Sequence, residues 1–225
     1  MATSIYLAWY IWDSYFYSLL IVVFRQTVMP ATYIGNIYTI GSTFWALVVR
    51  YALCFGVPMT ILDVGLMIHF RQPDVNIGYI VMTQIFIAFG GGTLVICEQM
   101  TVMAVSRHGN IPAVLAVEAM VCAMGSSVGS TIAAAMWTGI FPKKLMKNLP
   151  DSAKGDFASI YGDLTVQSSY PPGSPTRIAI DKLYGQTQKL MLITATCLYS
   201  ITLSSTFFWQ DVDVKNIKQR TKVLI

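Results

Sequence analysis

The sequence predicts an all-α, polytopic membrane protein with about six transmembrane helices. Of its 225 residues, 55% are hydrophobic and only 12% are charged, whereas a soluble domain carries roughly 25% charged residues. The charges gather in a few patches and leave long stretches uncharged, as membrane-spanning helices require. Most of these stretches also lack the polar face that a helix of such length needs in a soluble protein.

The net charge of +4 does not indicate binding to nucleic acid. Lysine and arginine cluster at 143–147 and 215–222, beside apolar runs, where anchoring to lipid headgroups is the usual role. We therefore expect the lipid bilayer, and no nucleic acid, as a partner.

Six apolar runs are long enough to be spans, at about 4–24, 31–49, 51–70, 77–103, 112–141 and 190–209. The first contains Asp13 and many aromatics; because no basic residue precedes it, we expect a retained span rather than a signal peptide. The fourth and fifth exceed the roughly 20 residues that cross a bilayer, so we expect the fifth to be tilted or bent. Between the second and third, Arg50 and its neighbours leave almost no turn, whereas a helical hairpin typically needs about two to eight residues. Either these two spans are shorter or a segment is missing near Arg50.

A polar stretch rich in proline and glycine separates the fifth span from the sixth. Basic residues that follow the last span closely predict a cytoplasmic tail. The sequence therefore predicts a five-span bundle at 1–141, an extracytoplasmic loop with short helices at 142–189, a sixth span at 190–210 and a cytoplasmic tail at 211–225. Within the loop we expect helical turns at 143–149 and 155–162, and irregular structure at 167–177.

Four acidic residues lie within the predicted spans: Asp13, Asp63, Glu98 and Glu118. Ionisable groups at bilayer depth are expensive and usually face a bundle interior or a substrate path. Glu98 is our main candidate for a proton-carrying group, and the alternative is a neutralised carboxyl hydrogen-bonded in a helix contact. Asp13 lies near Tyr15 and Tyr17, so this segment either lines a cavity for a bulky polar ligand or forms an aromatic belt at the membrane interface.

Small residues follow one another at one-turn spacing in the fifth span, at Gly125, Gly129 and Ala133. Such a stripe lets two helix backbones approach closely, so we interpret it as helix packing. The run Gly90–Gly92 lacks the lysine and the strand–helix context of a phosphate-binding loop. It indicates a bend or a close helix contact instead.

The four cysteines, Cys54, Cys97, Cys122 and Cys197, are too scattered for a disulfide framework or a zinc site. We expect them to be small core residues. His69 and His108 have no paired histidine or cysteine at ligand spacing. We therefore predict no metal site and no cofactor, and, because no nucleophile–base motif appears either, no enzyme.

Several segments carry a resemblance to a known family: Trp-Asp-Ser-Tyr-Phe-Tyr-Ser at 12–18, Ala-Thr-Tyr-Ile-Gly-Asn-Ile-Tyr at 31–38, Gly-Leu-Met-Ile-His-Phe-Arg at 65–71, Ile-Cys-Glu-Gln at 96–99 and Ser-Tyr-Pro-Pro-Gly-Ser-Pro-Thr-Arg at 169–177. With these segments the chain resembles the C-terminal half of the fungal siderophore–iron transporters of the major facilitator superfamily. The resemblance covers almost the whole chain.

The resemblance implies a proton-coupled importer of ferric siderophores in a plasma, endosomal or vacuolar membrane. It places Glu98 and Gln99 on the transport path, and Tyr170 and Arg177 as candidate substrate contacts in the outer loop, where a merely structural loop is the alternative. Asp63 and Glu118 depart from the family pattern, and we expect no function for them.

The resemblance also indicates what is missing, because the family has six further spans and a longer segment at Arg50. We therefore expect a half-transporter that does not transport alone, although it could pair with a second half or with itself. The alternative function is a non-transporting regulator or inert remnant that associates with a full-length transporter.

Overall fold

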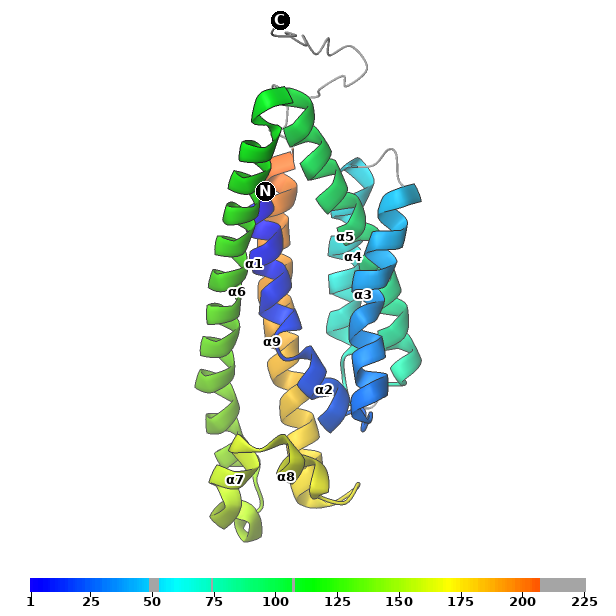
Figure 1. The fold of residues 1–225 in the computed structure, drawn as a ribbon. Coiled ribbons are helices and arrows are strands. Elements are labelled where there is room, and N and C mark those ends of the chain that lie inside the picture. The colour runs from blue at the N-terminus through cyan, green and yellow to red at the C-terminus, as the bar shows by residue number, and fades with distance from the viewer. Residues whose placement is uncertain (49–52, 74, 107, 207–225) are drawn as a thin grey trace, which may run out of the picture.

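The computed structural model describes residues 1–48, 53–73, 75–106 and 108–206, and within these ranges every regular element is a helix (Figure 1). The α-helices are α1 (Ala2–Asp13), α2 (Phe16–Val22), α3 (Val28–Val48), α4 (Leu53–Phe70), α5 (Ile77–Val105), α6 (Ile111–Asn148), α7 (Phe157–Gly162), α8 (Leu164–Ser169) and α9 (Pro175–Thr206). Short 3-10 turns cover His108–Asn110 and Asp151–Asp156. The predictions about Arg50 and the basic tail lie outside the described residues.

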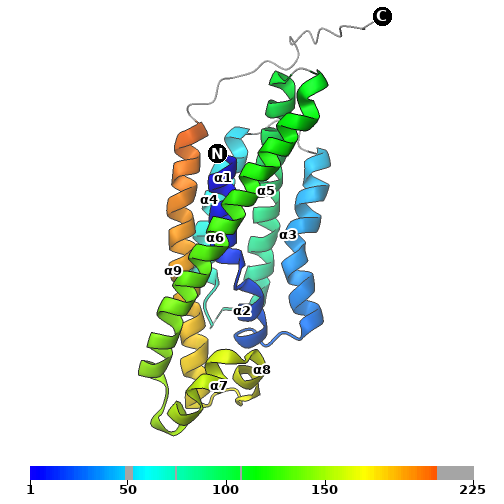
Figure 2. The same cartoon turned by 60° about the vertical axis from the view of Figure 1, so that its left-hand side comes forward.

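The long helices form two neighbouring groups, which Figures 1 and 2 show from two sides. One group contains α1, α6 and α9, and the other contains α3, α4 and α5. Contacts of α4 with α9 join the groups, and α2 runs from the first group toward α3. We call the end that carries α7 and α8 the loop end, and the end that carries the α5–α6 connection the turn end.

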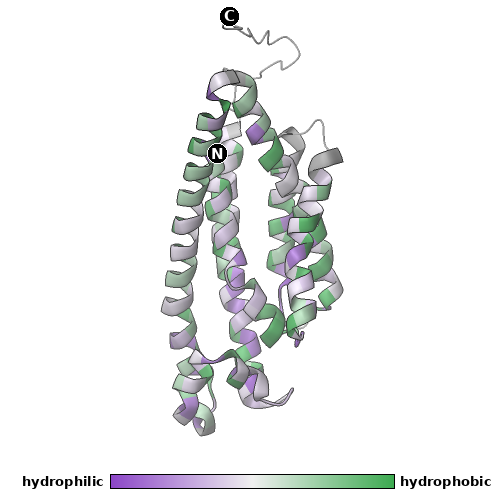
Figure 3. Ribbon diagram, in the orientation of Figure 1, coloured by the Kyte–Doolittle hydropathy of each residue, from purple (hydrophilic) through white to green (hydrophobic). Residues whose placement is uncertain are grey.

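Three helical segments of the described chain have the length and composition that a bilayer requires. Ala2–Val22, Ile77–Ala104 and Ile111–Asn148 are each long and apolar enough to cross a membrane, and Gly56–Phe70 is a shorter apolar helix. Hydrophilic residues gather around α7 and the lower half of α9 in Figure 3. Large apolar side chains such as Ile40 and Phe44 are mostly exposed, as lipid-facing residues are. The chain is an all-α, polytopic membrane protein.

The first predicted span is interrupted, which the sequence does not indicate. α1 ends at Asp13 and α2 begins at Phe16, and the hydroxyl of Ser14 donates a hydrogen bond back to the carbonyl of Tyr10. Tyr15 leaves the helical region, with φ −115° and ψ 13°. No glycine or proline lies in this stretch, so the usual markers of a helix break are missing.

Small residues set the closest helix approaches. Gly125 and Gly129 of α6 lie against the backbone of α1, where an added Cβ atom would lie 2.6 Å from the Thr3 carbonyl oxygen and 2.5 Å from that of Leu7. The run Gly90–Gly92 makes the corresponding contacts between α5 and its neighbours α3 and α4. Backbone therefore packs on backbone in both helix groups.

The polar stretch is more helical than its composition predicts. α6 continues to Asn148, and the expected irregular structure at 167–177 is wrong at both ends, because α8 reaches Ser169 and α9 begins at Pro175. The Asp163 carboxylate caps α8 by accepting the Thr165 N–H at 2.7 Å. Gly173 makes the turn between the two helices with φ +87°.

The expectation that the cysteines are core residues is wrong for Cys197, which is exposed on α9. Cys97 and Cys122 are only half-buried. An apolar position in a membrane helix faces lipid as readily as protein, because lipid tails are as apolar as a protein core.

Candidate functional sites

Glu98 is buried between helices rather than exposed to lipid. It is 6% exposed and lines a cavity of about 450 Å³ between α1, α5 and α6. Tyr6 of α1 and Gln99 line the same cavity, and the Glu98 carboxylate accepts a hydrogen bond from the backbone N–H of Ala2. At about 1.5 Å per residue, Glu98 lies about 10 Å from the C-terminal end of α5. The cavity is therefore near the turn end of the bundle.

Glu118 of α6 faces Glu98 across this cavity. The two carboxylates are close enough to interact electrostatically, and Cys122, one turn further along α6, lies beside them. No sequence pattern pairs these two acids, since Glu118 departs from the family pattern. Their common cavity makes them one site.

The aromatic segment at the α1–α2 break does not gather around one cavity. Tyr15 stacks on Trp137 of α6 with ring centroids 4.2 Å apart, whereas Tyr17 is 41% exposed. Asp13 is half-buried and interacts electrostatically with Arg71. The side chains of Asp13, Tyr15 and Tyr17 therefore lie in three different surroundings around the helix break.

Sequence reasoning missed a buried charge cluster formed by Asp13, Asp63 and Arg71. Asp63 lies two turns before Arg71, and neither residue exposes any surface. The Arg71 guanidinium carbon lies 4.4 Å from the ring centroid of Trp12 and 3.9 Å from that of Phe16. Arg71 follows an apolar helix and lies two residues before a proline, which favours an outward-pointing loop residue. The only available signal was the presence of two acids and one arginine in or beside apolar runs.

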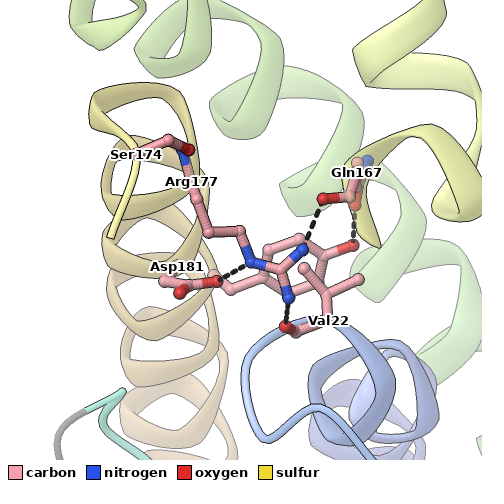
Figure 4. Close-up of polar contacts among 6 residues, drawn as sticks. Val22, Gln167, Ser174, Arg177 and Asp181 are labelled. Atoms are coloured by element: carbon pink, nitrogen blue, oxygen red, sulfur yellow. Dashed lines mark hydrogen bonds and ion pairs between the residues drawn. The ribbon is translucent and has the colours of Figure 1, made fainter. Parts of the chain in front are cut away.

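Arg177 holds the loop end together, as Figure 4 shows. Its guanidinium donates hydrogen bonds to the carbonyl oxygens of Val22 and Gln167, and its Nε atom lies 3.2 Å from the Asp181 carboxylate. The Tyr184 hydroxyl donates to the Gln167 side chain at 2.7 Å. Because Arg177 is only 3% exposed, this geometry favours the structural alternative for Arg177 over contact with a substrate.

A second cavity opens at the loop end. It has a volume of about 910 Å³, and its lining includes the amides of Gln26, Gln72, Asn76 and Gln186 together with Lys182. Such a volume suits a drug-sized ligand. A smaller cavity beside it is lined by Tyr170 and Arg177.

Metal binding finds no support in the part of the chain that the structure describes. There, no three side chains of histidine, cysteine, aspartate or glutamate lie close enough to hold an ion.

Outside the spans, a hydrogen bond from the Thr165 N–H lowers the pKa of the Asp163 carboxylate from its usual 3.8.

Several known proteins that are similar to this chain are transporters by name. It is 54% identical to "MFS siderochrome iron transporter 1" of Ajellomyces capsulatus over 97% of this chain and 39% of that protein. It is 42% identical to "Siderophore iron transporter mirB" of Emericella nidulans over 95% of this chain and 37% of that protein. With "Siderophore iron transporter 1" of Schizosaccharomyces pombe it shares 33% identity over 97% of this chain and 37% of that protein.

The chain thus spans less than two fifths of the length of these relatives. No family model and no solved structure matches it. The identity is nevertheless high and extends over almost the whole chain. The chain belongs to the siderochrome iron transporters of the major facilitator superfamily, and it is not an enzyme.

Proposed function

We propose that this chain forms one six-helix half of a proton-coupled importer of ferric siderophores, and that Glu98 carries the proton. The names of the relatives support the substrate class. The observation that carries the role of Glu98 is its burial in a cavity that it shares with Glu118.

The pairing of two acids gives a physical reason for proton binding. Two carboxylates that interact in a low-dielectric cavity repel each other when both are ionised, so the pair holds a proton that belongs to both. Such a proton is released when the cavity opens to water. A group that binds and releases a proton as the bundle changes shape is what proton coupling requires.

A substrate cavity between two helical halves needs a second half besides the helices of this chain. In transporters built from two helical halves, substrates bind near the midplane between the halves, and alternating access comes from rocking of one half against the other. The chain supplies helices for one wall, which supports the proposal that it transports only together with a second half, another copy or a full-length relative. The membrane it serves is the plasma membrane or an endosomal or vacuolar membrane.

The test is uptake of radioactive iron as a ferric siderophore by a fungal strain without its own siderophore transporters. The chain is expressed alone, and as a chimaera in which it replaces the matching 39% of the Ajellomyces relative. We expect uptake from the chimaera and none from the chain alone. Uptake by the chain alone would contradict the need for a second wall.

Glu98→Gln in the chimaera tests the role of the carboxylate. We expect loss of net uptake but retention of exchange between labelled and unlabelled siderophore, because exchange needs no net proton movement. Asp156→Asn, which neutralises an exposed acid in the loop, is the matched control and should leave both activities intact. Normal net uptake by Glu98→Gln would refute the role of Glu98.

The short coverage of the relatives favours a second candidate function, a regulator that binds a full-length transporter without transporting. Its mark would be co-purification with that transporter together with no effect of Glu98→Gln on uptake.

A further inference from the structure

Two ionisable side chains inside the bundle, those of Asp63 and Arg71, lack hydrogen-bond partners among the described residues. Neither oxygen of the Asp63 carboxylate and none of the guanidinium nitrogens of Arg71 is hydrogen-bonded to any residue that the structure describes. Both residues are fully buried. Because unpaired charges at bilayer depth cost several kcal/mol or more, such groups usually serve a function.

The position of Arg71 is fixed by aromatic rings on both sides of the α1–α2 break. Trp12 belongs to the last turn of α1 and Phe16 to the first turn of α2, and the Arg71 guanidinium lies within 4.4 Å of both ring centroids. Cation–π contacts of this kind stabilise the charged form of arginine. Arg71 therefore contributes one fixed positive charge.

The charges around Arg71 do not balance. It interacts electrostatically with Asp13 of α1 and Asp63 of α4, so two carboxylates face one guanidinium. The other titratable groups that face these acids are the phenols of Tyr38 on α3 and Tyr199 on α9, which are neutral. The described part of α5, which packs along α4, adds no acid or base that interacts with Asp63. With both acids ionised the cluster would carry one net negative charge.

We propose that Asp13, Asp63 and Arg71 form a buried binding site for one exchangeable proton, held on Asp63. A proton fits better than a metal cation, because hard cations need several oxygen ligands, and the nearby Thr60 hydroxyl already donates to the Gly56 carbonyl at 2.8 Å. Gln72 and Pro73, which follow Arg71 in the chain, line the cavity at the loop end. The site is distinct from that of Glu98 and needs only the fold, not siderophore transport.

The test uses the purified full chain in lipid vesicles and records the infrared C=O stretch of protonated carboxyl groups between pH 5 and pH 9. We expect Asp63→Asn to lose the signal of one protonated carboxyl per chain. We also expect it to reduce the fall in Tm with rising pH, because loss of the proton buries a net negative charge. Asp156→Asn should change neither measurement. Asp63→Ala carries the same expectations should Asp63→Asn not fold.

Two results would overturn the proposal. One is an unchanged carboxyl signal and unchanged pH dependence in both Asp63 variants. The other is a rise in wild-type Tm on replacing choline chloride by sodium chloride that Asp63→Asn abolishes without loss of a carboxyl signal, which would identify a sodium site.

Discussion

The contact of α6 with α1 yields the sharpest quantitative prediction, for Gly129→Ala. The new Cβ atom would lie 2.5 Å from the Leu7 carbonyl oxygen, 3.0 Å from Tyr10 Cβ and 3.1 Å from Leu7 Cα. Optimal contacts between carbon atoms are about 3.5–4.0 Å, and two of these three atoms belong to the backbone of α1. The helices must therefore separate, because no side chain can rotate away from the Leu7 backbone.

The matched control is Gly139→Ala, also on α6, where nothing lies within 4 Å of an added Cβ atom. Each substitution gains the same intrinsic helix propensity, about 1 kcal/mol. The difference between the two variants is then the cost of overpacking alone, about 1–3 kcal/mol. Gly139→Ala should be neutral or slightly stabilising, and Gly129→Ala should be clearly less stable than it.

Thermal unfolding of the purified chain in detergent measures this difference. One kcal/mol corresponds to roughly 2–4 °C for a chain of this size, so Gly129→Ala should melt several degrees below Gly139→Ala. Gly125→Ala should behave like Gly129→Ala, because its Cβ atom would lie 2.6 Å from the Thr3 carbonyl oxygen. Equal melting temperatures for the Gly129 and Gly139 variants would refute the backbone contact between α1 and α6.

Three further predictions concern the loop end and its neighbourhood. Arg177→Met leaves two buried carbonyl groups unpaired and should destabilise the chain by about 2–5 kcal/mol, with faster proteolysis around α8. Arg177→Lys should restore stability only in part. The control, Lys182→Met on the exposed side of α9, should resist proteolysis like wild type. Trp137→Ala removes a ring that stacks on Tyr15 and should lower the free energy of unfolding by about 3–5 kcal/mol. Trp137→Phe should retain most of the stability that Trp137→Ala loses. The lowered pKa of Asp163 means that its cap stabilises α8 at neutral pH and is lost as the pH falls below 3.8. The protection of the α8 amides, taken relative to the intrinsic exchange rate at each pH, should therefore fall in acid in wild type but change less with pH in Asp163→Asn.

Composition and small-residue spacing predict much of this fold, because the bilayer leaves few alternatives. A chain of long uncharged runs can satisfy its backbone hydrogen bonds in lipid only as helices or a closed barrel. The stripe at Gly125, Gly129 and Ala133 indicates a close helix approach, and α1 lies against that stripe. The partner helix itself cannot be read from the sequence, because the stripe has no complementary pattern on α1.

The candidate sites are less predictable, because they depend on which way a few side chains point. Glu98 is visible in the sequence as a costly charge. The same argument applies to Asp63 and Glu118, but their departure from the family pattern counts against a functional role when only the sequence is known. Arg71 contacts rings on both sides of the break between α1 and α2, and nothing in the local sequence marks that break.

α1 connects the two candidate proton sites. Tyr6 lines the Glu98 cavity near the turn end, and Asp13 belongs to the charge cluster toward the loop end. The two residues are separated along α1 by about 10 Å, at about 1.5 Å per residue. Between them the Leu7 backbone of α1 lies against Gly129 of α6. Because α1 carries a residue of each site, a displacement of α1 would change the surroundings of both sites together.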